Sequence, residues 1–242
     1  MPWKSWFSAG SRAERAAGKG YTIPVMEITL VRHGQSEANA GLTDFLDSPL
    51  TPLGTRQAQR AAQRLFGAGL TRAYTSPLRR ALQTIAPTCE ATGLKAEVYA
   101  DVCEYFNAVW PGYKTFPGLS PAQIQEQFPF AFLGHTFPCG EIWWPQVLED
   151  DGLMYARAVR VRDALLGLYA QTEECILVVS HAETVGRLTE AFLRVPPAPD
   201  DPPWSDNCGI TRLRVSPDPQ EPAILLIQND TSHLTGLAAD AS

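Results

Sequence analysis

Two short apolar runs constrain this chain more than any other feature of its sequence. Residues 28–31 and 175–180 are too short for ordinary helices and contain no charged side chain. Such runs are typical of strands in the middle of a parallel sheet, where both faces are covered. Helix-length segments such as 153–169, with apolar residues at helical spacing, lie between them. This alternation predicts an α/β fold, a three-layer α/β/α sandwich with a mostly parallel central sheet.

The same pattern divides the chain into expected elements. Strands are predicted at 26–31, 72–75, 95–99, 175–180, 210–215 and 223–228, and helices at 52–69, 77–92, 153–169 and 184–193. We expect residues 1–21 to form an N-terminal tail and residues 22–242 to form a single domain. An insertion at about 103–152 is rich in aromatic residues and proline, and only 120–128 has a helical pattern. Long irregular insertions often act as lids, so this one is interpreted as an irregular cap over the functional site.

Composition argues against several classes of partner. The 242 residues carry a net charge of −6, whereas nucleic-acid binding needs clustered lysine and arginine. No apolar run approaches the ~20 residues of a membrane span, and residues 1–20 lack the apolar centre of a secretion signal. Five scattered cysteines without a Cys-x-x-Cys pair favour reduced thiols in a cytoplasmic protein. No histidine or cysteine spacing is typical of zinc, so neither metal nor cofactor is predicted.

An arginine and a histidine stand side by side where the first predicted strand ends. Arg32 and His33 are followed at once by Gly34. Open α/β sheets bind ligands at the carboxyl ends of their strands, and glycine allows a tight turn and close approach of the backbone. A helix starting just after this point would direct free N–H groups at an anion. Because His181 ends another predicted strand, we expect both histidines at the same edge of the sheet.

Several segments around these residues occur in a recognisable order. They are Arg32-His33-Gly34 with Ser36 and Asn39, then residues 50–58, 75–84 with Arg80, 178–181, and 229–234. Together they span residues 26–234 and resemble the signature segments of the histidine phosphatase superfamily, the phosphoglycerate-mutase-like proteins. A lone Arg-His-Gly would be a weak signal, whereas ordered matches at plausible spacing are a strong one.

The resemblance implies roles for the residues that match. His33 would attack phosphorus and form a phosphohistidine, which neutral imidazole can do near pH 7. Arg32 and Arg80 would hold the phosphoryl oxygens, for which planar guanidinium groups are well shaped. His181 would donate a hydrogen bond to the transferring group, and Glu104 would protonate the leaving oxygen.

Other residues near these positions have lesser expected roles. Asn39 would bind a phosphoryl oxygen or hold its loop, and Ser36 is expected to cap the start of a helix. Arg79 competes for the role of the second arginine, but helix neighbours point about a hundred degrees apart, and family register disfavours it. His233 is expected to be structural, and His135 lies in the cap without an identifiable partner.

The proton donor has two competitors. Family position favours Glu104, although the residues that follow it depart from the family pattern, and Glu183 and Glu141 are the alternatives. Ala182 stands where the family usually has glycine, which changes the backbone contacts after the second histidine. Asp101 is interpreted as a turn residue at a strand end.

The family contains both hydrolases and mutases, and charge favours a hydrolase here. Between residues 105 and 152 only Lys114 and His135 are basic, against five carboxylates. A mutase would need cations to hold the other acidic group of its substrate, so a neutral or aromatic leaving group fits better. The chain is therefore expected to be a metal-independent phosphatase of small-molecule phosphomonoesters, in the phosphatase branch. The alternatives are a phosphoglycerate-type phosphomutase and an inactive protein that binds a phospholigand or partner. Neither the substrate nor the oligomeric state is predicted.

Overall fold

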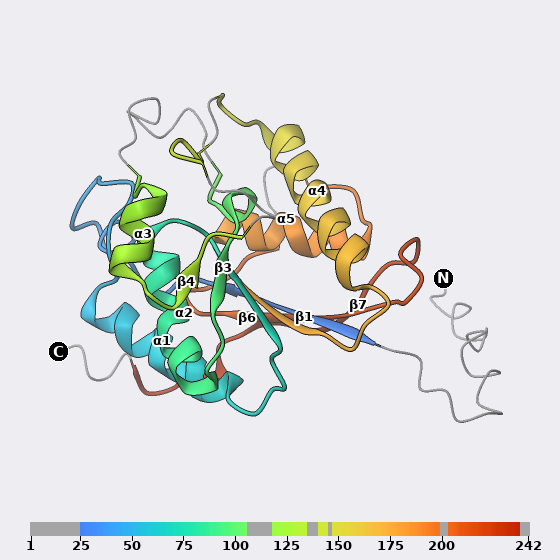
Figure 1. The fold of residues 1–242 in the computed structure, drawn as a ribbon, viewed down its shortest axis with the longest axis horizontal. Coiled ribbons are helices and arrows are strands. Elements are labelled where there is room, and N and C mark those ends of the chain that lie inside the picture. Colours follow the sequence, from blue (N-terminus) through green and yellow to red (C-terminus); the bar gives the residue numbers. More distant parts are fainter. Residues whose placement is uncertain (1–24, 106–117, 135–139, 145–146, 199–202, 238–242) are drawn as a thin grey trace, which may run out of the picture.

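The computed structural model describes residues 25–105, 118–134, 140–144, 147–198 and 203–237. In this part of the chain a seven-stranded sheet is accompanied by five α-helices (Figure 1). The strands are β1 (Met26–Arg32), β2 (Arg72–Thr75), β3 (Ala96–Val98), β4 (Ala131–Phe132), β5 (Cys175–Ser180), β6 (Ile210–Val215) and β7 (Ile224–Asp230). The helices are α1 (Pro52–Leu65), α2 (Arg79–Thr92), α3 (Pro121–Gln127), α4 (Asp151–Tyr169) and α5 (Ala182–Leu193), with 3-10 turns η2 (Ala100–Val102) and η4 (Ser232–Leu234).

The strand order is β4-β3-β2-β5-β1-β6-β7. The five strands from β4 to β1 pair in parallel, whereas β6 runs antiparallel to β1 and forms a hairpin with β7. The helices pack in two pairs, α4 with α5 and α1 with α2, and Figure 1 shows these pairs in separate parts of the molecule. The predicted α/β/α sandwich with a mostly parallel sheet is confirmed.

Alternate residues of the central strands supply two separate cores. Ile28 and Leu30 of β1 pack in the core that contains α4 and α5, whereas Val31 packs in the core that contains α1 and α2. Val178 and Val179 of β5 divide between the two cores in the same way. Residues 28–31 of β1 and residues 175–180 of β5 carry no charge because both faces of these strands are covered by helices.

The sequence predicts the bounds of the strands better than those of the helices. β2, β5 and β6 have the predicted bounds, whereas α1 ends at Leu65, four residues early. The chain leaves the helix at Phe66, whose ψ is 125°, and Gly67 and Gly69 both have positive φ. α4 is the longest helix, with 19 residues, and no helix in the described part is long and apolar enough to cross a membrane.

The insertion at 103–152 contributes regular structure to the sheet. It contains α3, which was expected, and the two-residue strand β4, which was not. Ala131 and Phe132 of β4 pair in parallel with Ala96 and Glu97 of β3 and so extend the sheet at its edge. Two residues are too few to show an alternating pattern, so this strand has no signal in the sequence.

The described aromatic residues of the insertion fill two small cores beneath it. Trp143 packs with Leu78 and Cys103, and Phe128 packs with Ile124 of α3. These side chains therefore stabilise the insertion against α2 and β3. Other residues of the sequence analysis lie outside the described residues: the tail at 1–21, Lys114, His135 and Cys139.

No helix follows His33 directly, which corrects the expectation for Ser36. The Ser36 Oγ accepts a hydrogen bond from the backbone N–H of Asn39 (3.2 Å), as a cap would, but it caps a turn. Ser36 also pairs with Leu50 in an isolated β-bridge, and Gly41 has φ +69°. The segment therefore folds back on itself, and the next helix begins only at Pro52.

Candidate active site

The two histidines lie at equivalent positions on neighbouring strands. Arg32, the last residue of β1, pairs with Ser180, the last residue of β5, and His33 and His181 directly follow them. The backbone N–H of His33 donates to the carbonyl of Ser180 (2.8 Å). The imidazole rings meet edge to face with centroids 5.0 Å apart, and both are buried. The structure thus brings together the two histidines that the sequence placed at one sheet edge.

Two glycines from separate motifs make room for this arrangement. A Cβ added to Gly34 would lie 2.6 Å from the carbonyl oxygen of Gly54, and one added to Gly54 would lie 2.0 Å from that of Gln35. The first turn of α1 therefore rests on the backbone next to His33. Gly34 does not have a positive φ, so its importance comes from this close packing instead of the tight turn that was expected.

Hydrogen bonds define the tautomer of His33. Its Nδ1 lies 2.7 Å from the carbonyl oxygen of Gly34, which can only accept, so Nδ1 carries the proton. Its Nε2 accepts a hydrogen bond from the Nε of Arg80 (3.1 Å). The unprotonated nitrogen, which is the one able to attack an electrophile, is therefore the one held beside Arg80.

Both histidines are held in their neutral form. Burial lowers the pKa of His33 well below its ordinary value, and the charges of Arg80 and Arg32 lower it further. Burial and the charge of Arg80 act on the pKa of His181 in the same direction. A neutral imidazole keeps its lone pair available at neutral pH and below.

Arg80 is the arginine that reaches this site, and its neighbour does not. Arg80 is buried, and its Nη1 donates to the carbonyl of Leu46 (2.6 Å). The side chain of Arg79 instead donates to the Oε1 of Gln127 on α3 (2.9 Å). The two point apart, as expected of neighbours on a helix.

The loop before α1 also caps the start of α2, the helix that carries Arg80. The Oδ1 of Asp47 accepts the backbone N–H of Arg79 (2.6 Å), so a residue 32 positions upstream satisfies the first turn of α2. Burial raises the pKa of Asp47 to about 6. No role was predicted for Asp47, because only the fold brings it to this helix end.

Two donors beside His33 have no partner among the residues that the structure describes. One is the Nε of Arg32, whose Nη1 donates to the carbonyl of Ser205 (2.7 Å) and whose guanidinium lies over the ring of Trp204. The other is the Nδ1 of His181, which is a donor in the tautomer whose Nε2 accepts from the Oγ of Ser76 (2.8 Å). Buried polar atoms without partners are costly, so an anion that accepts from them would be favoured.

Asn39 holds its loop in this structure. Its Oδ1 accepts from the backbone N–H of Ser36 (3.3 Å) and from the Nδ2 of Asn207 (3.2 Å). The same Nδ2 donates to the carbonyl of His33 (3.0 Å). Of the two roles expected for Asn39, this geometry is that of the loop-holding one, and Asn207 is a contributor that was not predicted.

Glu104 lies at the same site, directly after η2. Its side chain is buried, and its Oε1 accepts the backbone N–H of Tyr105 (2.9 Å). Burial raises its pKa above the ordinary value, with a smaller contribution from Glu183, despite the opposing charges of Arg80 and Arg32. A carboxyl group of this kind keeps its proton to higher pH than an exposed one.

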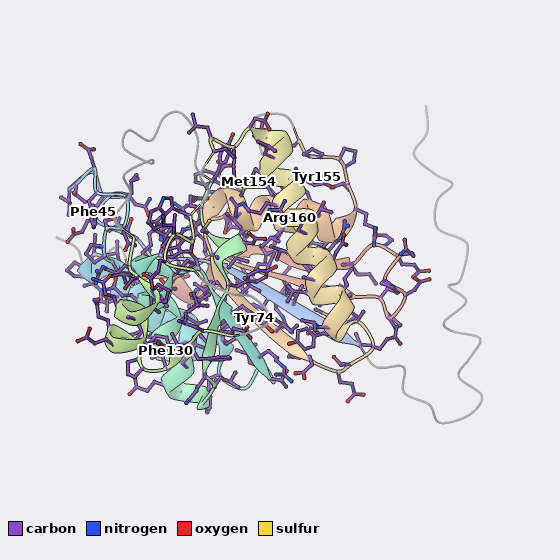
Figure 2. The ribbon with its side chains drawn as sticks, turned by 45° about the horizontal axis from the view of Figure 1, so that its top comes forward. Phe45, Tyr74, Phe130, Met154, Tyr155 and Arg160 are labelled. Atoms are coloured by element: carbon purple, nitrogen blue, oxygen red, sulfur yellow. The ribbon has the colours of Figure 1, made fainter. Side chains whose placement is uncertain are left out.

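A cavity of about 350 Å³ connects these groups. It is lined by Arg32, His33, Ser36, Ala38, Asn39, Thr43, Asp44, Phe45, Leu46, Arg80 and Glu104. Figure 2 shows Phe45 on the loop after β1, well away from Met154 and Tyr155 on α4. Five of the six predicted site residues line the cavity. The sixth, His181, lies against the ring of His33.

The remaining candidates do not line this cavity. Glu183 is half-buried in the first turn of α5, Glu141 is exposed, and Asp101 lies in η2. His233 lies in η4, which packs against α1. In the described ranges no group of three or more histidine, cysteine and carboxylate side chains could hold a metal ion.

The chain is similar to known proteins along most of its length. The model of the histidine phosphatase superfamily (branch 1) matches residues 28–230. The probable phosphoglycerate mutase GpmB of Yersinia enterocolitica is 30% identical over 220 residues, which are 89% of this chain and 98% of that protein. The GpmB of Proteus mirabilis is 29% identical, with the same coverage.

Solved structures show the same fold. A mycobacterial glucosyl-3-phosphoglycerate phosphatase is 25% identical with a TM-score of 0.60, and the match covers 85% of this chain and 99% of that one. YhfR of Bacillus stearothermophilus is 23% identical with a TM-score of 0.64, covering 86% of this chain and 99% of that one.

Proposed function

This chain belongs to branch 1 of the histidine phosphatase superfamily, and from that premise we propose that it hydrolyses phosphomonoesters through a phosphohistidine on His33. The observation that carries the proposal is the state of the His33 ring. His33 lines the cavity. Its Nε2 is unprotonated and lies beside Arg80, while its Nδ1–H is bound to a backbone carbonyl. A neutral, oriented imidazole with a cation at its attacking nitrogen is suited to attack a phosphoryl group.

The proposed reaction has two steps. The Nε2 lone pair of His33 attacks phosphorus, the bond from phosphorus to the leaving oxygen breaks, and the proton of Glu104 passes to that oxygen. Water then attacks the phosphohistidine, gives its proton back to Glu104, and the phosphorus–nitrogen bond breaks. Arg80 would turn its donors from His33 to the phosphoryl oxygens, with Arg32 and His181 supplying their unpaired donors.

The charges that line the cavity support hydrolysis of a phosphomonoester over isomerisation of phosphoglycerate. The GpmB relatives carry the name of a probable mutase, and that function needs a cation for the substrate carboxylate. Among the described lining residues the cations are Arg32 and Arg80, both at the phosphoryl position, and Asp44 adds a negative charge. The aromatic ring of Phe45 lines the same cavity, so a neutral or aromatic leaving group is the better fit.

The test is release of inorganic phosphate from 4-nitrophenyl phosphate in the presence of EDTA. We expect turnover that is the same with and without the chelator, because the proposed chemistry uses only side chains. 3-Phosphoglycerate should be a poor substrate and should not be isomerised. Isomerisation faster than phosphate release would show a mutase, and loss of turnover with EDTA would show a metal enzyme.

The directions of the pKa shifts predict a rate that rises and then falls with increasing pH. The reaction needs neutral His33, so its rate rises with pH only up to the lowered pKa of that ring. It also needs protonated Glu104, so the rate falls as pH passes the raised pKa of that carboxyl. Glu104→Gln has no proton to lose and should lack the descending limb, with kcat on an alkyl phosphate reduced ~10²–10⁴-fold. Titration of the substrate affects both enzymes equally, so the contribution of Glu104 is the difference between their pH profiles. Profiles of the same shape would assign the acid to another group.

A further inference from the structure

We propose that Arg157 of α4 positions the proton donor Glu104 by binding the backbone on which that side chain is mounted. This inference rests on the proposed function, because it assigns Arg157 to the step in which Glu104 protonates the leaving oxygen. Arg157 does not line the cavity and touches neither histidine, so it is a positioning residue.

The guanidinium of Arg157 binds three carbonyl groups of one short segment. Its Nη1 donates to the carbonyl oxygens of Asp101 (2.7 Å) and Cys103 (2.9 Å), and its Nη2 lies 3.3 Å from that of Glu104. The side chain of Arg157 is 3% exposed. The planar guanidinium has five N–H donors in fixed directions on three nitrogens, whereas a lysine has three donors on a single nitrogen and lacks this fork.

Two further side chains complete the hold on this segment. The Oγ of Ser180 donates to the carbonyl of Val102 (2.7 Å), and the Oγ1 of Thr184 donates to that of Cys103 (2.6 Å). Every backbone carbonyl from 101 to 104 thus accepts a hydrogen bond from a side chain. Ser180 and Thr184 flank His181 in sequence, so the segment that carries the acid is tied to the segment that carries the second histidine.

The charge of Arg157 is balanced by Glu149. The two carboxylate oxygens of Glu149 accept from the Nε (2.7 Å) and the Nη2 (2.8 Å) of Arg157, and both side chains are buried. Glu149 comes just before the helix-capping Asp150, at the end of the cap insertion, whereas Glu104 stands at its start. Arg157 therefore links the start of the insertion, through backbone carbonyls, to its end, through the carboxylate of Glu149.

A buried ion pair is a poor way to gain stability alone. Apolar residues of similar volume are often as stabilising, because removing two charges from water is costly. The pair instead fixes the orientation of the guanidinium group, and through it the position of the Glu104 backbone. Catalysis by a general acid depends on such placement, since a shift of about 1 Å can cost 10²-fold in rate.

The experiment uses two substrates that differ in their need for a proton. The leaving group of 4-nitrophenyl phosphate departs without protonation, whereas an alkyl phosphate such as glycerol 2-phosphate requires it. In the double variant Arg157→Met/Glu149→Gln no buried charge is left unpaired. The quantity to measure is the single-turnover rate of leaving-group release, because this step precedes the water step that both substrates share. We expect this rate to fall ~10²-fold for the alkyl phosphate and less than about threefold for the aryl phosphate, with substrate affinity nearly unchanged.

Two other variants keep the test decisive. Arg157→Lys retains the charge opposite Glu149 but loses the planar guanidinium. It should therefore also slow the alkyl substrate more than the aryl substrate, although the ion pair is kept. Arg162→Met is the matched control, because Arg162 is also buried on α4 and donates instead to the carbonyl of Ala191 (3.0 Å). Its effect should be equal on the two substrates.

Glu104→Gln separates the failure of this inference from that of the proposed function. If Glu104→Gln slows only the alkyl phosphate while both Arg157 variants slow the two substrates equally, Arg157 merely stabilises the fold and the inference is overturned. If Glu104→Gln slows leaving-group release equally from both substrates, Glu104 is not the proton donor and the proposed mechanism fails first.

Discussion

Replacing His33 with alanine is expected to reduce phosphate release by on the order of 10⁴-fold or more, because no other group takes over as nucleophile in the proposed reaction. The wild-type enzyme, quenched during turnover of 4-nitrophenyl phosphate, should show the added mass of one phosphoryl group in intact-protein mass spectrometry. His33→Ala should show none.

His233→Ala is the control for this experiment. Among the described histidines, His233 is the one outside the site: it lies in η4 and does not line the cavity. Its replacement should leave the rate and the labelling intact. A phosphoryl group mapped to any residue other than His33 would contradict the assignment.

Replacing Arg80 with alanine should raise the barrier of the chemical step by about 3 kcal/mol or more, which is a loss of at least ~10²-fold in kcat. Arg80 is the donor that lies 3.1 Å from the attacking nitrogen of His33. Its loss removes the positive charge nearest to where negative charge develops. Single-turnover kinetics with 4-nitrophenyl phosphate would measure the step directly.

Arg79→Ala provides a closely matched comparison for this prediction. It removes the same side chain one position earlier in α2, where the guanidinium binds Gln127 and not His33. We expect a change of less than about threefold, as for an exposed polar contact. A larger loss from Arg79→Ala than from Arg80→Ala would show that the phosphate-binding arginine has been wrongly assigned.

The parts of this molecule that are readable from sequence are those with strong local signals. β5 is six residues without a charge, and a strand covered on both faces must look like this. Because the carboxyl ends of parallel strands meet at one edge of the sheet, the positions of His33 and His181 at two strand ends predict that they lie together. β4 escapes detection because its two residues are held only by β3, and the Ser36 segment turns back through contacts made with Leu50.

The supporting residues of the site have no local signal at all. Asp47 contacts a helix end 32 residues away and Asn207 contacts His33 across 174 residues. Ser76 is an exception: it directly follows β2, so its position at a strand end predicts that it lies at the same sheet edge as His181. In the sequence, Arg157 does not differ from other polar residues on a helix. Its contacts with the backbone of residues 101–104 depend on the packing of α4 on η2.

The distance of 174 residues between Asn207 and His33 also has a consequence for how the protein is made. β1 leaves the ribosome early, but β5 and β6, which pair with its two edges, follow much later. At synthesis rates of about 5–20 residues per second, the strand that bears His33 waits on the order of ten seconds or more for its neighbours. The proposed activity is therefore not expected before β6 and Asn207 have been translated. During that interval an apolar strand with two open edges is available to other chains and to chaperones.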